Sequence, residues 1–305
     1  MKTDRKIIIG SRGSALALKQ VDIVKVALAA ANPALTFEVQ IITTRGDVNQ
    51  NPIPLGAIGK GWFTKEVEQG LSDGSIDLAV HSLKDMAQEM PVGLCIGAYL
   101  PREDARDALI TKHGQPLEEL LAGAVVGTDS ARRQIQMLEL RPDVVMQSLR
   151  GNVLTRLEKL MSENYDAIIL AAAGLKRLGL EHRITRYFEP NEMTPAPGQG
   201  ILAVQVREDN APLREMLRYI NDIDAAQIAS IERSFSETTG GGCKSPTGAY
   251  AFREGNEYRL IGMVATDNKS VLRDEMRVPF GKSAELGKTL AEKLLQQLAG
   301  HGKNI

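Results

Sequence analysis

Short runs of apolar, β-branched residues alternate along the first 220 residues with longer segments whose apolar positions recur every three or four residues. The first such pair predicts a strand over residues 7–9 and a helix over residues 15–31, which Asn32 and Pro33 end. Further strands are predicted over residues 37–43, 76–80, 94–100, 108–110, 124–126, 144–146, 167–171 and 201–206, and helices over 63–71, 130–140, 153–161, 173–180 and 212–220. Repeated strand–loop–helix units predict an α/β fold with largely parallel sheets.

The pattern divides the chain into three parts. Two blocks are rich in βα units, and the chain crosses between them twice. This pattern predicts two lobes around a cleft. Beyond residue 221 a helix over 225–237, strands over 249–252, 259–266 and 271–278, and a helix over 284–298 predict a small α+β domain. We therefore expect domain 1 at residues 1–100 and 201–220, domain 2 at 101–200 and domain 3 at 221–305.

Composition narrows the class of protein. The chain has 305 residues, 43% of them hydrophobic and 25% charged, with a net charge of −1, as expected for a globular protein without a field that attracts nucleic acid. Aromatic residues make up only 4%, too few for a base-stacking surface, and no apolar run is long enough for a signal-peptide core or a membrane helix. The two cysteines fit a reducing cytoplasm.

Cationic side chains follow the strands at the points where parallel strands end. Helix N-termini at such loops favour anions, and arginine adds bidentate recognition of a carboxylate or phosphate. A single exposed arginine means little, but many at one sheet edge predict a site for a polyanion. The cations concerned are Arg12, Lys60, Lys84, Arg132, Arg133, Arg150, Arg156 and Arg177.

Two further features leave alternatives open. Asp85 is an acid among these cations; it could stabilise a developing positive charge or hold an N–H group, or it could merely offset Lys84 and a helix dipole. Cys243 follows three glycines and precedes Lys244, so it is either an accessible, reactive thiol or an incidental residue of a glycine-rich turn. The histidines and cysteines show no metal-ligand spacing, so no metal site is predicted.

An ordered set of short motifs resembles the porphobilinogen deaminase (hydroxymethylbilane synthase) family over almost the whole chain. No single motif is specific, but their number and order are. The motifs are GSRGSALAL (10–18), TRGD (44–47), GKGWF (59–63), AVHSLKD (79–85), RED (102–104), GTDSARRQ (127–134), LRGNV (149–153), TRL (155–157), YDAIILAA (165–172), AGLKRLGL (173–180), PGQG (197–200) and GGC (241–243).

The resemblance implies the fold, the cofactor and the reaction. The two lobes should resemble those of type II periplasmic binding proteins, with the cysteine on the third domain. A dipyrromethane cofactor should be attached to Cys243 by a thioether. Four porphobilinogen units should then be joined head to tail with loss of ammonia, and hydroxymethylbilane released, as a step of heme and other tetrapyrrole biosynthesis.

The resemblance also assigns roles to residues. It implies Asp85 as the catalytic acid, which holds pyrrole N–H groups and stabilises the cation left when ammonia departs. Each pyrrole carries an acetate and a propionate, which the cations would bind. The implied cofactor-binding residues are Cys243, Lys84, Ser82, Ser130, Arg132, Arg133, Arg150 and Gly151, and the substrate-binding residues are Arg12, Ser14, Lys60, Arg150, Arg156 and Arg177.

The chain departs from the family pattern at a few positions. Gly56 stands where a lysine is common, and Met86 and Ala87 precede Pro91 without the usual early proline. Asp129 stands where the family commonly has serine, and its carboxylate would repel a substrate carboxylate unless it pairs with Arg132 or Arg133 or points away. We expect these changes to alter loops or rates and not the reaction.

The main alternative is a two-lobed carboxylate-binding protein without catalysis, which would leave Cys243 and Asp85 unused. A cysteine hydrolase is a weaker alternative, because no base stands beside Cys243 in the sequence. We expect a cytoplasmic monomer that binds a small-molecule substrate and neither nucleic acid nor membrane.

Overall fold

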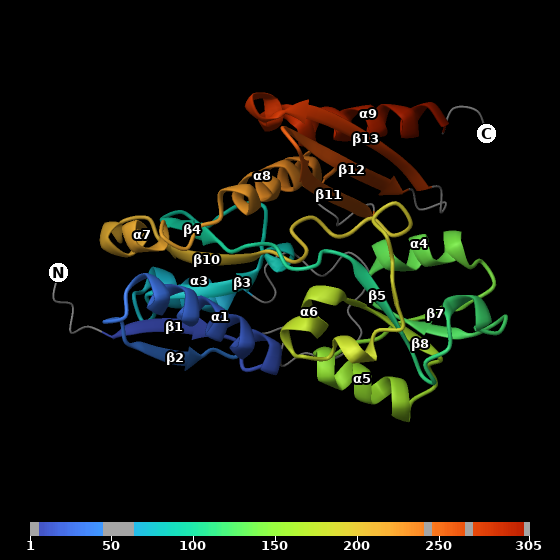
Figure 1. Ribbon diagram of the computed structural model, residues 1–305, viewed down its shortest axis with the longest axis horizontal. Coiled ribbons are helices and arrows are strands. Elements are labelled where there is room, and N and C mark those ends of the chain that lie inside the picture. Colours follow the sequence, from blue (N-terminus) through green and yellow to red (C-terminus); the bar gives the residue numbers. More distant parts are fainter. Residues whose placement is uncertain (1–5, 45–63, 241–245, 266–270, 302–305) are drawn as a thin grey trace. The chain divides into compact units, whose positions relative to one another are not determined.

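The computed structural model describes residues 6–44, 64–240, 246–265 and 271–301. These residues contain three β-sheets (Figure 1). The chain divides into two compact units, Met1–Glu103 with Ile201–Ala226 and Asp104–Gly200 with Gln227–Ile305. Each unit is therefore assembled from two separate stretches of sequence.

Unit 1 contains a five-stranded sheet in the order β2-β1-β3-β10-β4. Its strands are β1 (Ile7–Ser11), β2 (Phe37–Ile41), β3 (Leu78–Ser82), β4 (Leu94–Tyr99) and β10 (Leu202–Arg207). Strand β1 runs parallel to β2 and β3, and β10 runs antiparallel to β3 and β4. The strand that joins β3 to β4 is thus supplied from about a hundred residues further along the chain.

Helices cover both faces of this sheet because side chains alternate along buried strands. Ile7 and Ile9 of β1 pack with α1 (Ala15–Ala31) and α7 (Ala211–Leu217) on one face. Ala79 of β3 packs on the opposite face with α3 (Lys65–Ser72). A one-turn 3-10 helix, η1 (Leu83–Asp85), directly follows β3.

Unit 2 contains a second five-stranded sheet, in the order β7-β6-β8-β5-β9. Its strands are β5 (Asp107–Thr111), β6 (Val125–Gly127), β7 (Val145–Gln147), β8 (Ala167–Ala171) and β9 (Arg186–Tyr187). Strand β6 runs parallel to β7 and β8, whereas β5 runs antiparallel to β8 and β9. The arrangement repeats that of unit 1, with β5 in the place of β10.

The helices of this sheet also lie on both faces. Met137 of α4 (Ala131–Leu140) packs with Leu109 and Ile169 on one face. The other face packs on α5 (Val153–Ser162) and α6 (Ala172–Arg177). Two short 3-10 helices, η2 (Leu117–Glu119) and η3 (Glu181–Arg183), lie in the connections.

The C-terminal part of unit 2 is a three-stranded antiparallel sheet with two helices. It consists of α8 (Ile223–Thr238), whose first four residues fall in unit 1, and of β11 (Thr247–Glu254), β12 (Glu257–Ala265), β13 (Val271–Pro279), η4 (Phe280–Glu285) and α9 (Leu286–His301). Gly287 of α9 lies so close to α8 that a Cβ there would be 2.1 Å from the carbonyl oxygen of Ile231. The sheet packs against α4 through Met263 and Ile135.

The predicted fold class is confirmed in its two βα sheets and its small C-terminal α+β domain. The division into three domains stays a prediction, since the second and third sheets fall in one compact unit. Within the described residues, no helix is both long and apolar enough to cross a membrane.

Candidate functional site

In unit 1, predicted site residues come together where β1 and β3 end. The strands are parallel neighbours, so their carboxyl ends lie at one edge of the sheet. Arg12 follows β1, and Ser14 caps α1 by accepting a hydrogen bond from the Ala17 N–H at 3.2 Å. Ser82 ends β3, and its Oγ accepts a hydrogen bond of 2.9 Å from Gln20 Nε2.

Lys84 and Asp85 lie in the turn that follows Ser82. Leu83 between them and the strand is 2% exposed, and its N–H donates to the Ile201 carbonyl at 3.0 Å. Lys84 is half-buried and Asp85 is exposed. The buried leucine therefore anchors the turn while the Asp85 carboxylate faces solvent, where it can meet a ligand.

A buried polar network lies behind this turn. His81 Nε2 lies 2.9 Å from Gln205 Oε1, and Gln205 Nε2 donates to Glu68 Oε1 at 3.3 Å. Burial lowers the pKa of His81 to about 4, against the opposing effect of its hydrogen bond to Gln205. His81 is therefore neutral near pH 7 and donates its Nε2–H to Gln205. Its contact with Gln205 fixes the end of β3.

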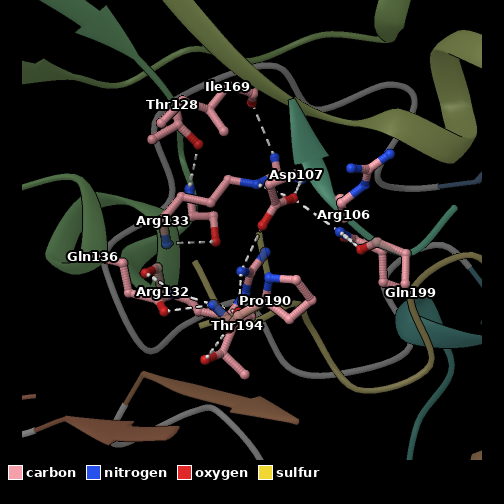
Figure 2. Close-up of polar contacts among 12 residues, drawn as sticks. Arg106, Asp107, Thr128, Arg132, Arg133, Gln136, Ile169, Pro190, Thr194 and Gln199 are labelled. Carbon is pink, nitrogen blue, oxygen red and sulfur yellow. Dashed lines mark hydrogen bonds and ion pairs between the residues drawn. The ribbon is translucent and has the colours of Figure 1, made fainter. Parts of the chain in front are cut away.

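In unit 2, the paired arginines at the start of α4 point into the protein and bind one buried carboxylate (Figure 2). Arg132 Nη1 donates to Asp107 Oδ2 at 2.7 Å and to the Thr194 carbonyl at 2.7 Å. Arg133 donates to Asp107 Oδ1 from Nε at 3.0 Å and from Nη2 at 2.7 Å. Gln199 Nε2 adds a fourth contact to Asp107 at 2.9 Å.

Charge compensation explains how Asp107 is held ionised although its side chain is fully buried. Burial by itself would raise the pKa of this carboxyl, but the guanidinium groups of Arg132 and Arg133 hold it well below its ordinary value. The two arginines thus have a structural role that the sequence argument did not foresee. Arg133 Nη1 also donates to the Ile169 carbonyl at 3.1 Å, so all three nitrogens of Arg133 have partners within the protein, and the role of the two arginines as cofactor ligands stays a prediction.

The carboxylate of Asp129 pairs with Arg150, and not with Arg132 or Arg133, which were the partners considered from the sequence. Arg150 Nε lies 2.8 Å from Asp129 Oδ2. Ser148 Oγ donates to Asp129 Oδ1 at 2.7 Å. Asp129 follows β6 and the other two follow β7, and these strands are parallel neighbours. Ser130 next to Asp129 caps α4.

Gly151 and Arg156 shape the N-terminus of α5. Gly151 has φ +122°, and a Cβ there would lie 2.8 Å from Cγ2 of Thr155, so the position requires glycine. Arg156 Nε donates to the Gly151 carbonyl at 2.8 Å. Arg177, at the end of α6, donates from Nη2 to the Gly200 carbonyl at 2.6 Å. Both arginines are half-buried and held by backbone carbonyls.

Two predicted site residues, Lys60 and Cys243, lie outside the described residues. Among the described residues, no group of three or more histidine, cysteine, aspartate or glutamate side chains could hold a metal ion.

Sequence reasoning missed the residues that support the site from behind. Asp107 had a readable signal, because an acid that opens an apolar strand must find a cationic partner when buried. Gln20 and Gln205 gave no such signal, since an amide side chain is as common on a surface as in a buried network.

The fold and these side chains define an α/β protein that presents cations, hydroxyl groups and one exposed carboxylate at strand ends and helix N-termini, as suits an anionic ligand. The family model described as "Porphobilinogen deaminase, dipyromethane cofactor binding domain" matches residues 7–215, and that described as "Porphobilinogen deaminase, C-terminal domain" matches residues 226–296. The chain belongs to the porphobilinogen deaminase family.

Relatives of known name agree with this assignment. The chain is 46% identical over 293 residues to the porphobilinogen deaminase of Roseiflexus sp. (strain RS-1), covering 95% of this chain and 96% of that protein. It is 44% identical over 295 residues to the porphobilinogen deaminase of Oceanobacillus iheyensis, covering 96% and 95%.

Solved structures show a weaker likeness. Substrate-binding domain 2 of Lactococcus lactis GlnP has a TM-score of 0.42 at 12% identity, covering 76% of this chain and 95% of that chain. A YaeC-family lipoprotein of Enterococcus faecalis has a TM-score of 0.43 at 12% identity, covering 78% and 98%.

Proposed function

We propose that the chain is a hydroxymethylbilane synthase, which joins four porphobilinogen units head to tail with loss of ammonia and releases hydroxymethylbilane. The observation that carries this proposal is the match of both family models in order over nearly the whole chain. The structure supports it with anion-binding side chains at strand ends in both units.

The described residues suit a dipyrromethane. Such a group carries four carboxylates and two pyrrole N–H groups, so its site needs cations for the first and an acceptor for the second. Lys84 and Ser82 in unit 1 supply donors beside the exposed acceptor Asp85. In unit 2 the proposed ligands are Ser130, Arg132, Arg133, Arg150 and Gly151. When bound, the cofactor supplies the nucleophilic pyrrole carbon that the first substrate joins.

We assign Asp85 the central catalytic role. When ammonia leaves porphobilinogen, the C–N bond breaks and a positive charge develops on the substrate. A carboxylate fixed beside the pyrrole accepts its N–H and stabilises that charge. Asp85 meets both needs, because its carboxylate is exposed while Leu83 and His81 hold the turn from behind.

The substrate carboxylates would be held by Arg12, Ser14, Lys60, Arg150, Arg156 and Arg177. Each charge-assisted hydrogen bond contributes about 1.5–3 kcal/mol, so a few together fix one ring. Arg156 and Arg177 already contact backbone carbonyls, which restricts their side chains before a ligand arrives. The alternative of a binding protein without catalysis gives no reason for a cofactor-binding domain.

Cys243 is the proposed attachment point, through a thioether formed once during maturation. We further propose a cytoplasmic monomer, which fits a protein of this size with two cysteines.

Intact-mass spectrometry tests the proposal directly. Protein purified from cells that make porphobilinogen should exceed the 33.2 kDa chain mass by one dipyrromethane, and it should convert porphobilinogen to hydroxymethylbilane. Cys243→Ser should lose the added mass and the activity, whereas Cys95→Ser, at the chain's other cysteine, should keep both. An active chain of bare mass would refute the covalent cofactor.

A further inference from the structure

The Asp129 carboxylate pairs with Arg150. One oxygen lies 2.8 Å from Arg150 Nε, and the other accepts the Ser148 hydroxyl at 2.7 Å. The carboxylate of Asp129 is 29% exposed and the Arg150 side chain is 21% exposed, so water screens the pair only in part. The ion pair therefore neutralises an arginine that the proposed function assigns to a ligand carboxylate.

The pair is not needed to place the backbone of Arg150. Leu149 before it is 1% exposed and buried in the core, and Gly151 after it is fixed at φ +122°. Arg150 is therefore held at its backbone on both sides. What Asp129 adds beside the guanidinium of Arg150 is a negative charge, 2.8 Å from Nε.

We propose that the Asp129 carboxylate competes with a porphobilinogen carboxylate for Arg150 and so lowers the affinity of the site for this ligand. This inference rests on the proposed function. An arginine has five N–H donors, so Asp129 at Nε does not exclude a second carboxylate. The ligand carboxylate instead contacts Arg150, whose charge Asp129 already balances, and it is repelled by the Asp129 carboxylate. A carboxylate bound in this way is released more readily, which suits a site whose ligand lengthens as the reaction proceeds.

Steady-state kinetics with porphobilinogen on the cofactor-loaded enzyme tests the proposal. Asp129→Asn keeps the shape of the side chain but removes its charge, so the KM should fall about five- to tenfold while kcat stays within about twofold. Asp129→Glu, which restores the charge, should return the KM toward that of the wild type.

Asp143→Asn is the matched control. Asp143 pairs with Arg141 Nε at 2.7 Å in the same unit, so this variant removes an equal charge from an arginine that is assigned no ligand. Its KM should equal that of the wild type.

An unchanged or raised KM in Asp129→Asn would overturn the inference. If that variant fails to fold, Asp129→Ser provides the same comparison, and failure of both variants to fold would mean that Asp129 is structural. If the wild type itself makes no hydroxymethylbilane, the proposed function fails. A changed KM in the Asp143 control would show that the effect is not specific to Arg150.

Discussion

Asp85 combines an exposed carboxylate with a turn that is anchored from behind. Asp85→Asn keeps the size of the side chain but removes the negative charge, so kcat should fall by about a hundredfold or more, as for loss of one electrostatic contact in a transition state. Because the side chain is exposed, the thermal midpoint should hardly change. Stopped assays of ammonia release and a thermal scan would check both. Undiminished turnover would remove Asp85 from the mechanism.

Asp107 behaves in the opposite way, because it is buried with two guanidinium groups. Asp107→Asn leaves those cations without their shared anion, so the free energy of unfolding should fall by roughly 3–5 kcal/mol. Asp143→Asn, at a surface pair that water screens, should cost far less. Urea unfolding would measure both. Similar small losses in the two variants would mean that the buried pair gives no net stabilisation.

His81 gives the stability a pH dependence near neutrality. Its pKa is lowered in the folded state, so the unfolded chain binds the proton first as the pH falls. The full contribution of His81 to the free energy of unfolding is present above pH 6.5. This contribution is lost as the pH falls toward 4, at about 1.4 kcal/mol per pH unit. His81→Gln should flatten this part of the urea-midpoint profile, and an unchanged profile would contradict the role of His81.

The turn at Gly151 shows how one position sets the entry to a helix. Gly151→Ala places a Cβ against Thr155 at a φ that side chains rarely adopt, and should cost about 2–4 kcal/mol. Gly123 has φ +83° with open space around it, so Gly123→Ala should cost only about 1–2 kcal/mol. Equal losses in thermal unfolding would show that the clash with Thr155 is relieved.

Most helices and strands could be predicted because their signals are local. The helix at residues 15–31 has its expected ends, since Ser14 caps it and Asn32-Pro33 stops it. Strand β9 has two residues and pairs only at the sheet edge, so it leaves no periodic pattern. The sequence alone did not pair Arg132 and Arg133 with Asp107, because that partner lies about 25 residues away on strand β5.

At the scale of the whole molecule, the five-stranded sheet of unit 1 includes a strand, β10, from a distant part of the chain. A chain that ends at residue 200 lacks β10, so β3 and β4 have no strand between them. We expect such a fragment to aggregate, and a chain that ends at residue 226, which completes unit 1, to be more soluble. Sedimentation of the two fragments after expression at equal levels would compare them.

Because β10 lies late in the sequence, the ribosome synthesises it well after the strands with which it pairs. About a hundred residues separate the end of β4 from the start of β10, which is roughly 5–20 s of translation. Throughout that interval the edges of β3 and β4 that pair with β10 have no hydrogen-bonding partner from that strand. We expect slower translation through residues 100–200 to lengthen the interval in which these strand edges are exposed to aggregation.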